Sequence, residues 1–436
     1  MQSPGPTLWR DRSFLLYWLG RSISLFGTQI TVVVLPILVF QRTRSALLTS
    51  LLGVLEVLPY LVFGLLAGAL ADRLDRKRLM IGSDLINAAL LASIPLANAL
   101  GVLSLPHIYA VALLSACAFV WFDVANFGAL PALVGRARLV AANSLIGSST
   151  ITVETVGAAL AGVLAATVGA AFALTGDAVS YLLSAVALLL VRRSFNNVRS
   201  HDLPAAGAGG LRPALRRILA DIRAGLHFLW QHRLVRALTL LGFGVSFTSG
   251  AISSLIVVYA VRALGLAATD ARIGLIFTAG SVGAILASAL LPRLHRLLPP
   301  GWISLGGMAA MLLFSVVLAL VPGFSAALVI YALWIAFTTL VQINGTVLRQ
   351  RVIPEQLLSR TNAAARMIAW GGAPVGALLG GGLAELIPIR ETYLVMTIGV
   401  AISALLGWFS PLRDRNALHD VIAEPAEPVA QPEQGQ

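Results

Sequence analysis

Long apolar runs recur along the whole chain, and short gaps that carry arginine separate them. A run of roughly 20 apolar residues is long enough to cross a hydrocarbon core of about 30 Å as a helix. With 58% hydrophobic and 11% charged residues, the chain is too apolar for a soluble globular protein. Twelve membrane-spanning helices are therefore predicted, near residues 14–40, 48–71, 79–100, 108–133, 142–166, 170–191, 234–261, 272–292, 302–322, 325–348, 362–387 and 391–410.

Arginines favour alternate gaps between these spans, and they account for almost all of the net charge of +12. Cytoplasmic loops of membrane proteins carry the excess of basic residues, so this pattern predicts that both termini are cytoplasmic. Arg42, Arg44, Arg262, Arg272 and Arg390 are exceptions, in gaps on the other side. The arginine-rich gaps lie near residues 10–12, 73–78, 136–138, 192–236, 293–296, 349–360 and 413–415.

The chain divides into two halves of six spans each, residues 1–192 and 234–412. The segment between them, residues 193–233, is predicted to be a linker that ends in a basic amphipathic helix at the cytoplasmic interface. Asn143, Gly157 and Gly162 recur as Asn362, Gly376 and Gly381 at one constant offset. We therefore expect an all-α membrane protein whose two six-helix bundles are related by a pseudo-two-fold repeat. The polar, Pro-rich tail of residues 413–436 is expected to be disordered and cytoplasmic.

The gap between the second and third spans carries the densest cluster of charges in the chain, Gly68-Ala-Leu-Ala-Asp72-Arg73-Leu-Asp75-Arg76-Lys77-Arg78. Such a cluster beside apolar flanks marks a membrane face. The pattern resembles the signature loop between the second and third helices of major facilitator superfamily transporters. That resemblance implies a conformational latch on the cytoplasmic side, formed by Gly68, Asp72, Arg73, Arg76 and Asp84. The alternative is that the cations of this loop only anchor the topology.

Further motifs resemble the branch of that superfamily that exports drugs, macrolides and siderophores. They are Phe14-Leu-Leu-Tyr-Trp-Leu-Gly20-Arg21, Leu130-Pro131, Ala142-Asn143-Ser144 and Trp370-Gly-Gly-Ala-Pro374-Val-Gly376. The resemblance implies a bacterial inner-membrane efflux transporter that exports an amphipathic small molecule, such as an antibiotic or siderophore, by proton antiport with alternating access. It also implies a monomer without cofactors, with the small molecule, protons and the lipid bilayer as its partners, and a role in multidrug or antibiotic resistance.

An enzyme or an ATP-driven pump is not expected from this sequence. The only lysine is Lys77, so there is no phosphate-binding loop, and neither a nucleophile elbow nor a zinc-type His/Cys spacing occurs. The single cysteine, Cys117, excludes a disulfide framework and a thiol metal site. The basic charge lies in the gaps between spans, which indicates topology rather than nucleic-acid binding.

Small residues and a proline mark the fifth and eleventh spans. Gly157 and Gly162 in the fifth span, and Pro374 and Gly376 in the eleventh, are predicted to allow close helix packing. Related exporters carry a Gly/Pro element in the fifth span that is thought to bias them towards antiport, but here Ala158 replaces its proline.

Charged residues inside the predicted spans are the candidates for proton coupling or substrate contact. A charge there costs at least a few kcal/mol, and a carboxylate in a low-dielectric cavity is able to exchange a proton near neutral pH. An inert ion pair is the alternative. Acids in mid-membrane favour a cationic or neutral cargo, an inference that Arg21 weakens. The candidates are Glu154, Asp123, Glu56 and Arg21, with Gln29, Gln342 and Asn344 as polar residues of the cavity.

Two other functions are compatible with the same sequence. One is an importer, or a lipid or metabolite facilitator, on the same fold. The other is a membrane scaffold without transport, which would keep its activity when the buried carboxylates are neutralised.

Overall fold

A computed structural model describes residues 8–71, 74–135, 138–195 and 223–413, and all their side chains except those of residues 64–71, 355–356 and 358–360. The helices are η1 (Leu8–Arg10), α1 (Arg12–Thr43), α2 (Ala46–Ala71), α3 (Arg76–Ala99), α4 (Leu105–Val134), α5 (Leu139–Thr167), α6 (Ala170–Leu190), α8 (Arg233–Ser254), α9 (Ile256–Arg262), α10 (Arg272–Leu297), α11 (Pro300–Leu320), α12 (Phe324–Val352), α13 (Glu355–Leu383), α14 (Ile389–Met396) and α15 (Ile398–Trp408). Residues 223–231, at the end of the predicted linker, are also helical, and the predicted tail after Arg413 lies outside the described residues.

The predicted spans appear as long helices, and the all-α fold class is confirmed. Eleven segments of the described chain are long and apolar enough to cross a membrane. The twelfth long helix, α13, contains six glycines and Arg366, which lower its hydropathy. Two predicted spans are each divided into two helices, α8 and α9 at Leu255, and α14 and α15 at Thr397.

Several helix ends follow from local sequence. The side chain of Asp11 accepts a hydrogen bond from the N–H of Phe14 at the start of α1, and Asp75 accepts one from the N–H of Arg78 at the start of α3. Each carboxylate satisfies a backbone donor that has no partner within its helix. Gly135 ends α4 with a φ of 75°, a backbone region that glycine adopts without a steric penalty.

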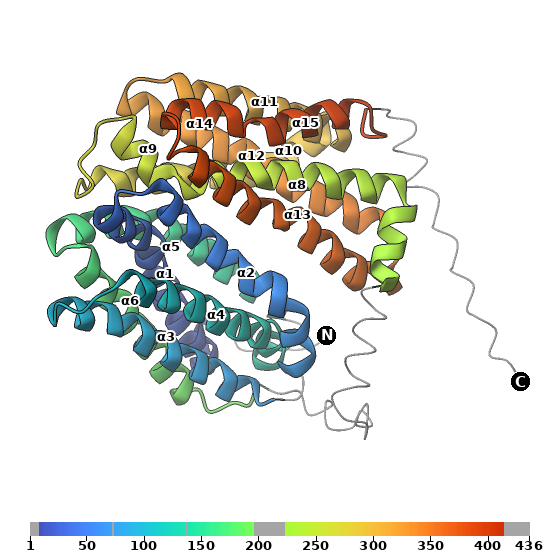
Figure 1. Cartoon of the computed structure of the whole chain (residues 1–436). Coiled ribbons are helices and arrows are strands. Elements are labelled where there is room, and N and C mark those ends of the chain that lie inside the picture. The colour runs from blue at the N-terminus through green and yellow to red at the C-terminus, as the bar shows by residue number, and fades with distance from the viewer. Residues whose placement is uncertain (1–7, 72–73, 136–137, 196–222, 414–436) are drawn as a thin grey trace, which may run out of the picture.

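Helices α1 to α6 precede residues 196–222 and helices α8 to α15 follow them, and each group forms its own bundle (Figure 1). In the first bundle α1 packs on α5 and α6, and α4 packs on α2 and α3. The second bundle repeats this pattern, since α8 packs on α13 and α15, and α12 packs on α10 and α11. The bundles meet where α2 contacts α13 and where α5 contacts α10. These two contacts are equivalent, because α2 corresponds to α10 and α5 corresponds to α13 in the repeat. This pattern is the pseudo-two-fold relation that the sequence predicts.

We call the face where α1 begins and α15 ends the terminal face, and the other face the opposite face. The turns at residues 43–46, 99–105, 262–272 and 383–389 lie at the opposite face.

Candidate functional site

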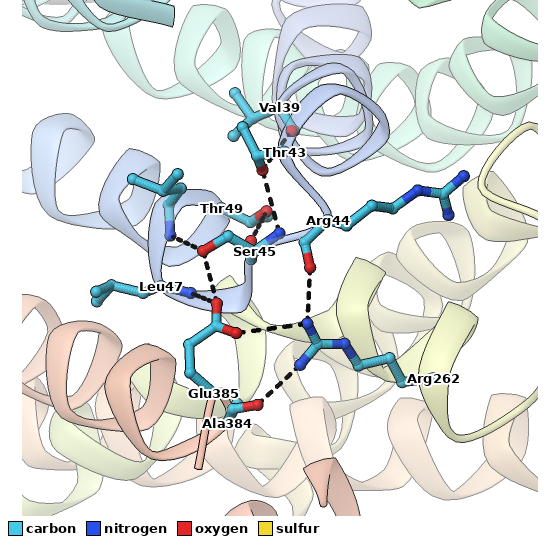
Figure 2. A network of polar contacts seen from close by, with 10 residues as sticks. Val39, Thr43, Arg44, Ser45, Leu47, Thr49, Arg262, Ala384 and Glu385 are labelled. Atoms are coloured by element: carbon cyan, nitrogen blue, oxygen red, sulfur yellow. Dashed lines mark hydrogen bonds and ion pairs between the residues drawn. The ribbon is translucent and has the colours of Figure 1, made fainter. Parts of the chain in front are cut away.

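A polar clamp joins the two bundles at the opposite face (Figure 2). The carboxylate of Glu385 accepts hydrogen bonds from the Ser45 hydroxyl at 2.6 Å and the Leu47 N–H at 3.1 Å. The Arg262 guanidinium lies 3.6 Å from the other Glu385 oxygen and donates to the carbonyl of Arg44 at 2.7 Å. Arg44 and Ser45 belong to the first bundle, whereas Arg262 and Glu385 belong to the second. We refer to these four residues as the clamp.

The chemistry of a helix N-terminus explains why Glu385 is ionised in the clamp. Burial raises the pKa of Glu385, but the hydrogen bonds from Ser45 and from the N–H groups of Ala46 and Leu47, together with the charge of Arg262, lower it further, so the net pKa is below its ordinary value. The Glu385 carboxylate lies beside the N-terminus of α2, where a negative charge also interacts favourably with the dipole of that helix. The clamp therefore depends on a negative charge at Glu385.

Close backbone contact joins the bundles beside the clamp. A Cβ placed on Gly162 of α5 would lie 2.7 Å from the Cα of Gly274 of α10 and 2.6 Å from the carbonyl oxygen of Ala271. The Thr278 hydroxyl donates to the Thr155 carbonyl at 3.3 Å, and Gln41 donates to the Ala268 carbonyl at 2.8 Å. Only glycine allows this approach of α5 to α10.

A cavity of about 450 Å³ lies in the second bundle between α8, α12 and α13. Its polar lining includes Gln342, Arg349, Asn362 and Arg366, and Trp370 contributes an aromatic wall. The lining continues to Gln350 and Leu412 near the terminal face. We call it the inner cavity.

Residues of the first bundle complete this region. The Tyr60 hydroxyl of α2 donates to the Asp123 carboxylate of α4 at 3.1 Å, and the Tyr60 ring lies 6.5 Å from the Trp370 ring. Tyr60 thus connects a predicted carboxylate of the first bundle to the inner cavity of the second.

A smaller cavity of about 310 Å³ lies between the bundles nearer the clamp and contains Glu56. Three serines, Ser249, Ser253 and Ser254, line it with Glu56, and none of its described lining residues is basic. The Ser249 hydroxyl is buried without a hydrogen-bond partner among the described residues. Glu56 is therefore a carboxylate beside hydroxyl groups and apolar surface, and it forms no ion pair with a described residue.

The other predicted cavity residues are distributed differently. Gln342 lines the inner cavity, whereas Asn344 is fully buried in the second bundle, where its amide contacts His295, Ser304 and the Pro300 carbonyl. Glu154 is half-buried on α5, one residue before the Thr155 carbonyl that Thr278 contacts. Asn344 thus holds helices of one bundle together and does not line the cavity.

Two more predicted residues lie on α1. Gln29 packs against Gly157 of α5, since a Cβ placed on Gly157 would lie 3.0 Å from the Cβ of Gln29. Arg21 lies with its guanidinium 6.0 Å from the centre of the Phe122 ring, and its Nε is buried without a partner among the described residues.

The residues of the predicted latch are only partly described. Asp72, Arg73 and the surroundings of Gly68 lie outside the described residues. Arg76 donates to the Gly128 carbonyl of α4 at 3.2 Å. Asp84 is fully buried inside the first bundle, and neither of its carboxylate oxygens accepts a hydrogen bond from a described residue.

Close packing also occurs at the eleventh span. Gly376 and Gly372 pack against the backbone of α8. A Cβ placed on Gly376 would lie within 2.2 Å of the Phe247 carbonyl oxygen, and one placed on Gly372 would lie 2.2 Å from the Phe243 carbonyl oxygen. Pro374 lies inside α13, next to Ala373, whose backbone contacts Gly250.

Sequence reasoning overlooked Arg349 and Arg366, which line the inner cavity, and Tyr60, which binds Asp123. Arg366 lies inside the predicted span 362–387, so the search for charges within spans had the signal needed to find it. Arg44, Ser45 and Arg262 of the clamp lie in arginine-poor gaps, where the sequence singled out the two arginines only as exceptions, whereas Glu385 lies inside the predicted span 362–387.

Comparison with known proteins identifies the family. A family model described as transmembrane secretion effector matches residues 6–434. The multidrug efflux pump Tap of Mycolicibacterium fortuitum is 26% identical over 392 residues, which are 88% of this chain and 92% of that protein. The enterobactin exporter EntS of Citrobacter koseri is 25% identical over 403 residues, 90% of each chain.

Among solved structures, a bacterial homologue of the human lysosomal transporter Spinster in an inward-facing, unoccupied conformation superposes with a TM-score of 0.73. It covers 97% of this chain and 100% of its own, at 13% identity. The likeness is one of fold. The family consists of transporters, which confirms that the protein is not an enzyme: this chain belongs to the transmembrane secretion effector family of major facilitator superfamily transporters.

Proposed function

We propose that the protein exports an amphipathic small molecule by proton antiport, alternating between states open to either side of a bacterial inner membrane. The observation that carries this proposal is a pair of features that lie towards opposite faces of the molecule. A closed polar clamp lies at the opposite face, and a cavity with charged and aromatic walls extends towards the terminal face. The export of drugs and enterobactin by the relatives supports the direction.

The proposed orientation has both termini in the cytoplasm. The arginine-rich gaps belong to the terminal face, and basic residues concentrate on the cytoplasmic side of membrane proteins. Substrate would then enter the inner cavity from the cytoplasm or the inner leaflet while the clamp closes the outside. Single cysteines at Val102, an exposed residue of the opposite face, and at Trp9, an exposed residue of the terminal face, test this orientation in a Cys117→Ser background. A membrane-impermeant thiol reagent added to whole cells is expected to label only position 102.

Three carboxylates are the proposed proton carriers, Asp123, Glu56 and Glu154. Asp123 lies beside the inner cavity and Glu56 lies in the smaller one, so protonation of either would change the charge that faces the space between the bundles. Release of that proton to the cytoplasm would be coupled to substrate export. The pH gradient is the only energy source that this scheme requires.

Everted membrane vesicles give the direct test. Proton-driven uptake of a fluorescent drug is measured for Asp123→Asn, Glu56→Gln and Glu154→Gln, with a protonophore to define the coupled component. Glu391→Gln is the matched control, since Glu391 is an exposed acid at the start of α14. At least one of the three variants is expected to lose coupled uptake. Wild-type uptake by all three would rule out these residues as the coupling site.

A further inference from the structure

The inner cavity has an unusual balance of charge. Arg349 and Arg366 both line it, and no Asp or Glu is among its described lining residues. Neither arginine forms an ion pair among the described parts of the chain. Acids in the predicted spans favoured a cationic or neutral cargo, but this wall of the cavity carries two positive charges.

Arg349 is the more informative of the two. The residue is 7% exposed, and its Nε is buried without a hydrogen-bond partner among the described residues. Its guanidinium donates to the Thr346 hydroxyl on its own helix at 3.3 Å. Burying a cation with unsatisfied donors is unfavourable unless an anion or further acceptors compensate it. The described residues supply no such anion, so the compensating group is expected to come from a ligand.

Arg366 provides a second positive charge on the next helix. Its guanidinium carbon lies 4.3 Å from the centre of the Trp370 ring, a cation–π contact that orients the group while leaving it exposed to the cavity. Arg366 and Arg349 carry like charges and line the same cavity, so they repel one another. An anion bound between the two guanidinium groups would replace this repulsion with two attractions. Planar guanidinium donors match the paired oxygens of carboxylate and phosphate groups.

The rest of the lining indicates what such an anion is attached to. The Asn362 amide oxygen is buried with no donor from the part of the chain that the structure describes, so it is available to a hydroxyl or amide N–H of a ligand. Trp370, Met308 and Val245 supply apolar surface to the same cavity. A ligand that satisfies all these groups has an acidic head and an apolar body.

We propose that Arg349 and Arg366 form an anion-binding subsite that holds the carboxylate or phosphate group of an amphipathic organic anion. The subsite deepens the export function proposed above and rests on it only where the anion is taken to be the exported cargo. Binding itself does not depend on that function.

Three probes that differ only in charge test the subsite, namely 1-pyrenebutyrate, 1-pyrenebutanol and 1-pyrenebutylammonium. Binding to the purified full-length protein in phosphatidylcholine nanodiscs is measured by energy transfer from tryptophan to pyrene. Wild-type protein is expected to prefer the carboxylate over the alcohol, and Arg366→Gln and Arg349→Gln are expected to weaken carboxylate binding by about tenfold each. Alcohol binding should change little.

Arg351→Gln is the matched control, because Arg351 is an exposed arginine at the end of the same helix α12 and does not line the cavity. It should keep the preference for the carboxylate. If Arg349→Gln fails to fold, Arg349→Lys and Arg366→Gln still answer the question, since lysine keeps the charge. Equal binding of carboxylate and alcohol by the wild type, or an unchanged preference in Arg366→Gln, would overturn the subsite.

Two further arms separate the sources of the anion and the two proposals. Nanodiscs with added phosphatidylglycerol show whether a lipid phosphate competes with pyrenebutyrate, which would support the subsite and assign a lipid to it. Vesicle uptake of the same probes tests export. Selective binding of the carboxylate without transport would support the subsite and contradict export. Transport of all three probes without a preference for the carboxylate would support export and contradict the subsite.

Discussion

Asp11 shows how much a single side chain contributes at the start of the first helix. It caps α1 through the N–H of Phe14 and pairs with Arg193 at 2.7 Å and Arg138 at 3.2 Å. Burial raises the pKa of Asp11, but the hydrogen bonds from Arg193 and Phe14, and the charges of both arginines, lower it further, so the net pKa is below its ordinary value. The carboxylate therefore ties the beginning of α1 to the start of α5 and to the segment that follows α6.

Asp11→Asn and Asp11→Ala separate the two contributions of this residue. Asparagine retains a capping oxygen but loses the charge, whereas alanine loses both, so alanine should cost about 1 kcal/mol more. Thermal unfolding in detergent is expected to rank the proteins as wild type, then Asn, then Ala. Because the folded-state pKa of Asp11 is lowered, the advantage of the wild type over Asp11→Asn should be complete at neutral pH. It should disappear as pH falls through that lowered pKa. An advantage that persists in strong acid would contradict this assignment.

The contact between α5 and α10 depends on glycine at the point where the two helices touch. Gly162 and Gly274 face one another with no space for a Cβ on either. Small residues permit such backbone contact in a membrane, where apolar side chains gain little by leaving lipid. The contact lies on the clamp side of the molecule and belongs to the state in which the clamp is closed.

Gly162→Val is expected to force α5 and α10 apart at the cost of about 1–3 kcal/mol for overpacking. The closed clamp should become less populated, and transport should fall while the protein still inserts and folds. Gly147→Ala on the same helix is the control, since no atom lies within 4 Å of a Cβ placed there. Limited proteolysis and vesicle transport provide the measurements. Normal transport by Gly162→Val would show that this contact is not required.

At the scale of the whole molecule, the clamp decides whether the two bundles are held together at the opposite face. It combines an ion pair within the second bundle, Arg262 with Glu385, with hydrogen bonds that join both partners to Arg44 and Ser45 of the first bundle. The net pKa of Glu385 is lowered when the clamp is closed, so closure is favoured while this carboxylate is ionised. Acid on this side of the membrane should open it.

Glu385→Gln is expected to widen the distance between spin labels at Val102 and Ser325, two exposed residues of the opposite face in different bundles. In the wild type the distance should be short at neutral pH and should lengthen as pH falls through the lowered pKa of Glu385. The variant should lose this pH dependence, and the Glu391→Gln control should keep it. A pH response that survives in Glu385→Gln would assign the effect to another group.

Much of the fold was predictable because a helix in lipid satisfies its own backbone hydrogen bonds. Length and hydropathy therefore located the helices, and the recurrence of Gly157 as Gly376 indicated the repeat. The breaks at Leu255 and Thr397 were not predicted, since the apolar runs continue through both positions. Asn344 illustrates the limit for side chains. It has the polarity of a cavity residue, but its partners on α10 and α11 place it inside the bundle.

Composition and the arrangement of charges were thus enough for the membrane class, the helices and the family, because each of these follows from local sequence. The grouping of side chains into sites depended on how helices cross. Tyr60 with Asp123 and Arg349 with Arg366 are pairs from different helices, and Ser45 and Glu385 lie in two different turns. Tertiary packing alone brings the members of each pair together. For that reason the sequence indicated buried acids, and only the folded molecule showed that two arginines share a cavity whose described lining contains no acid.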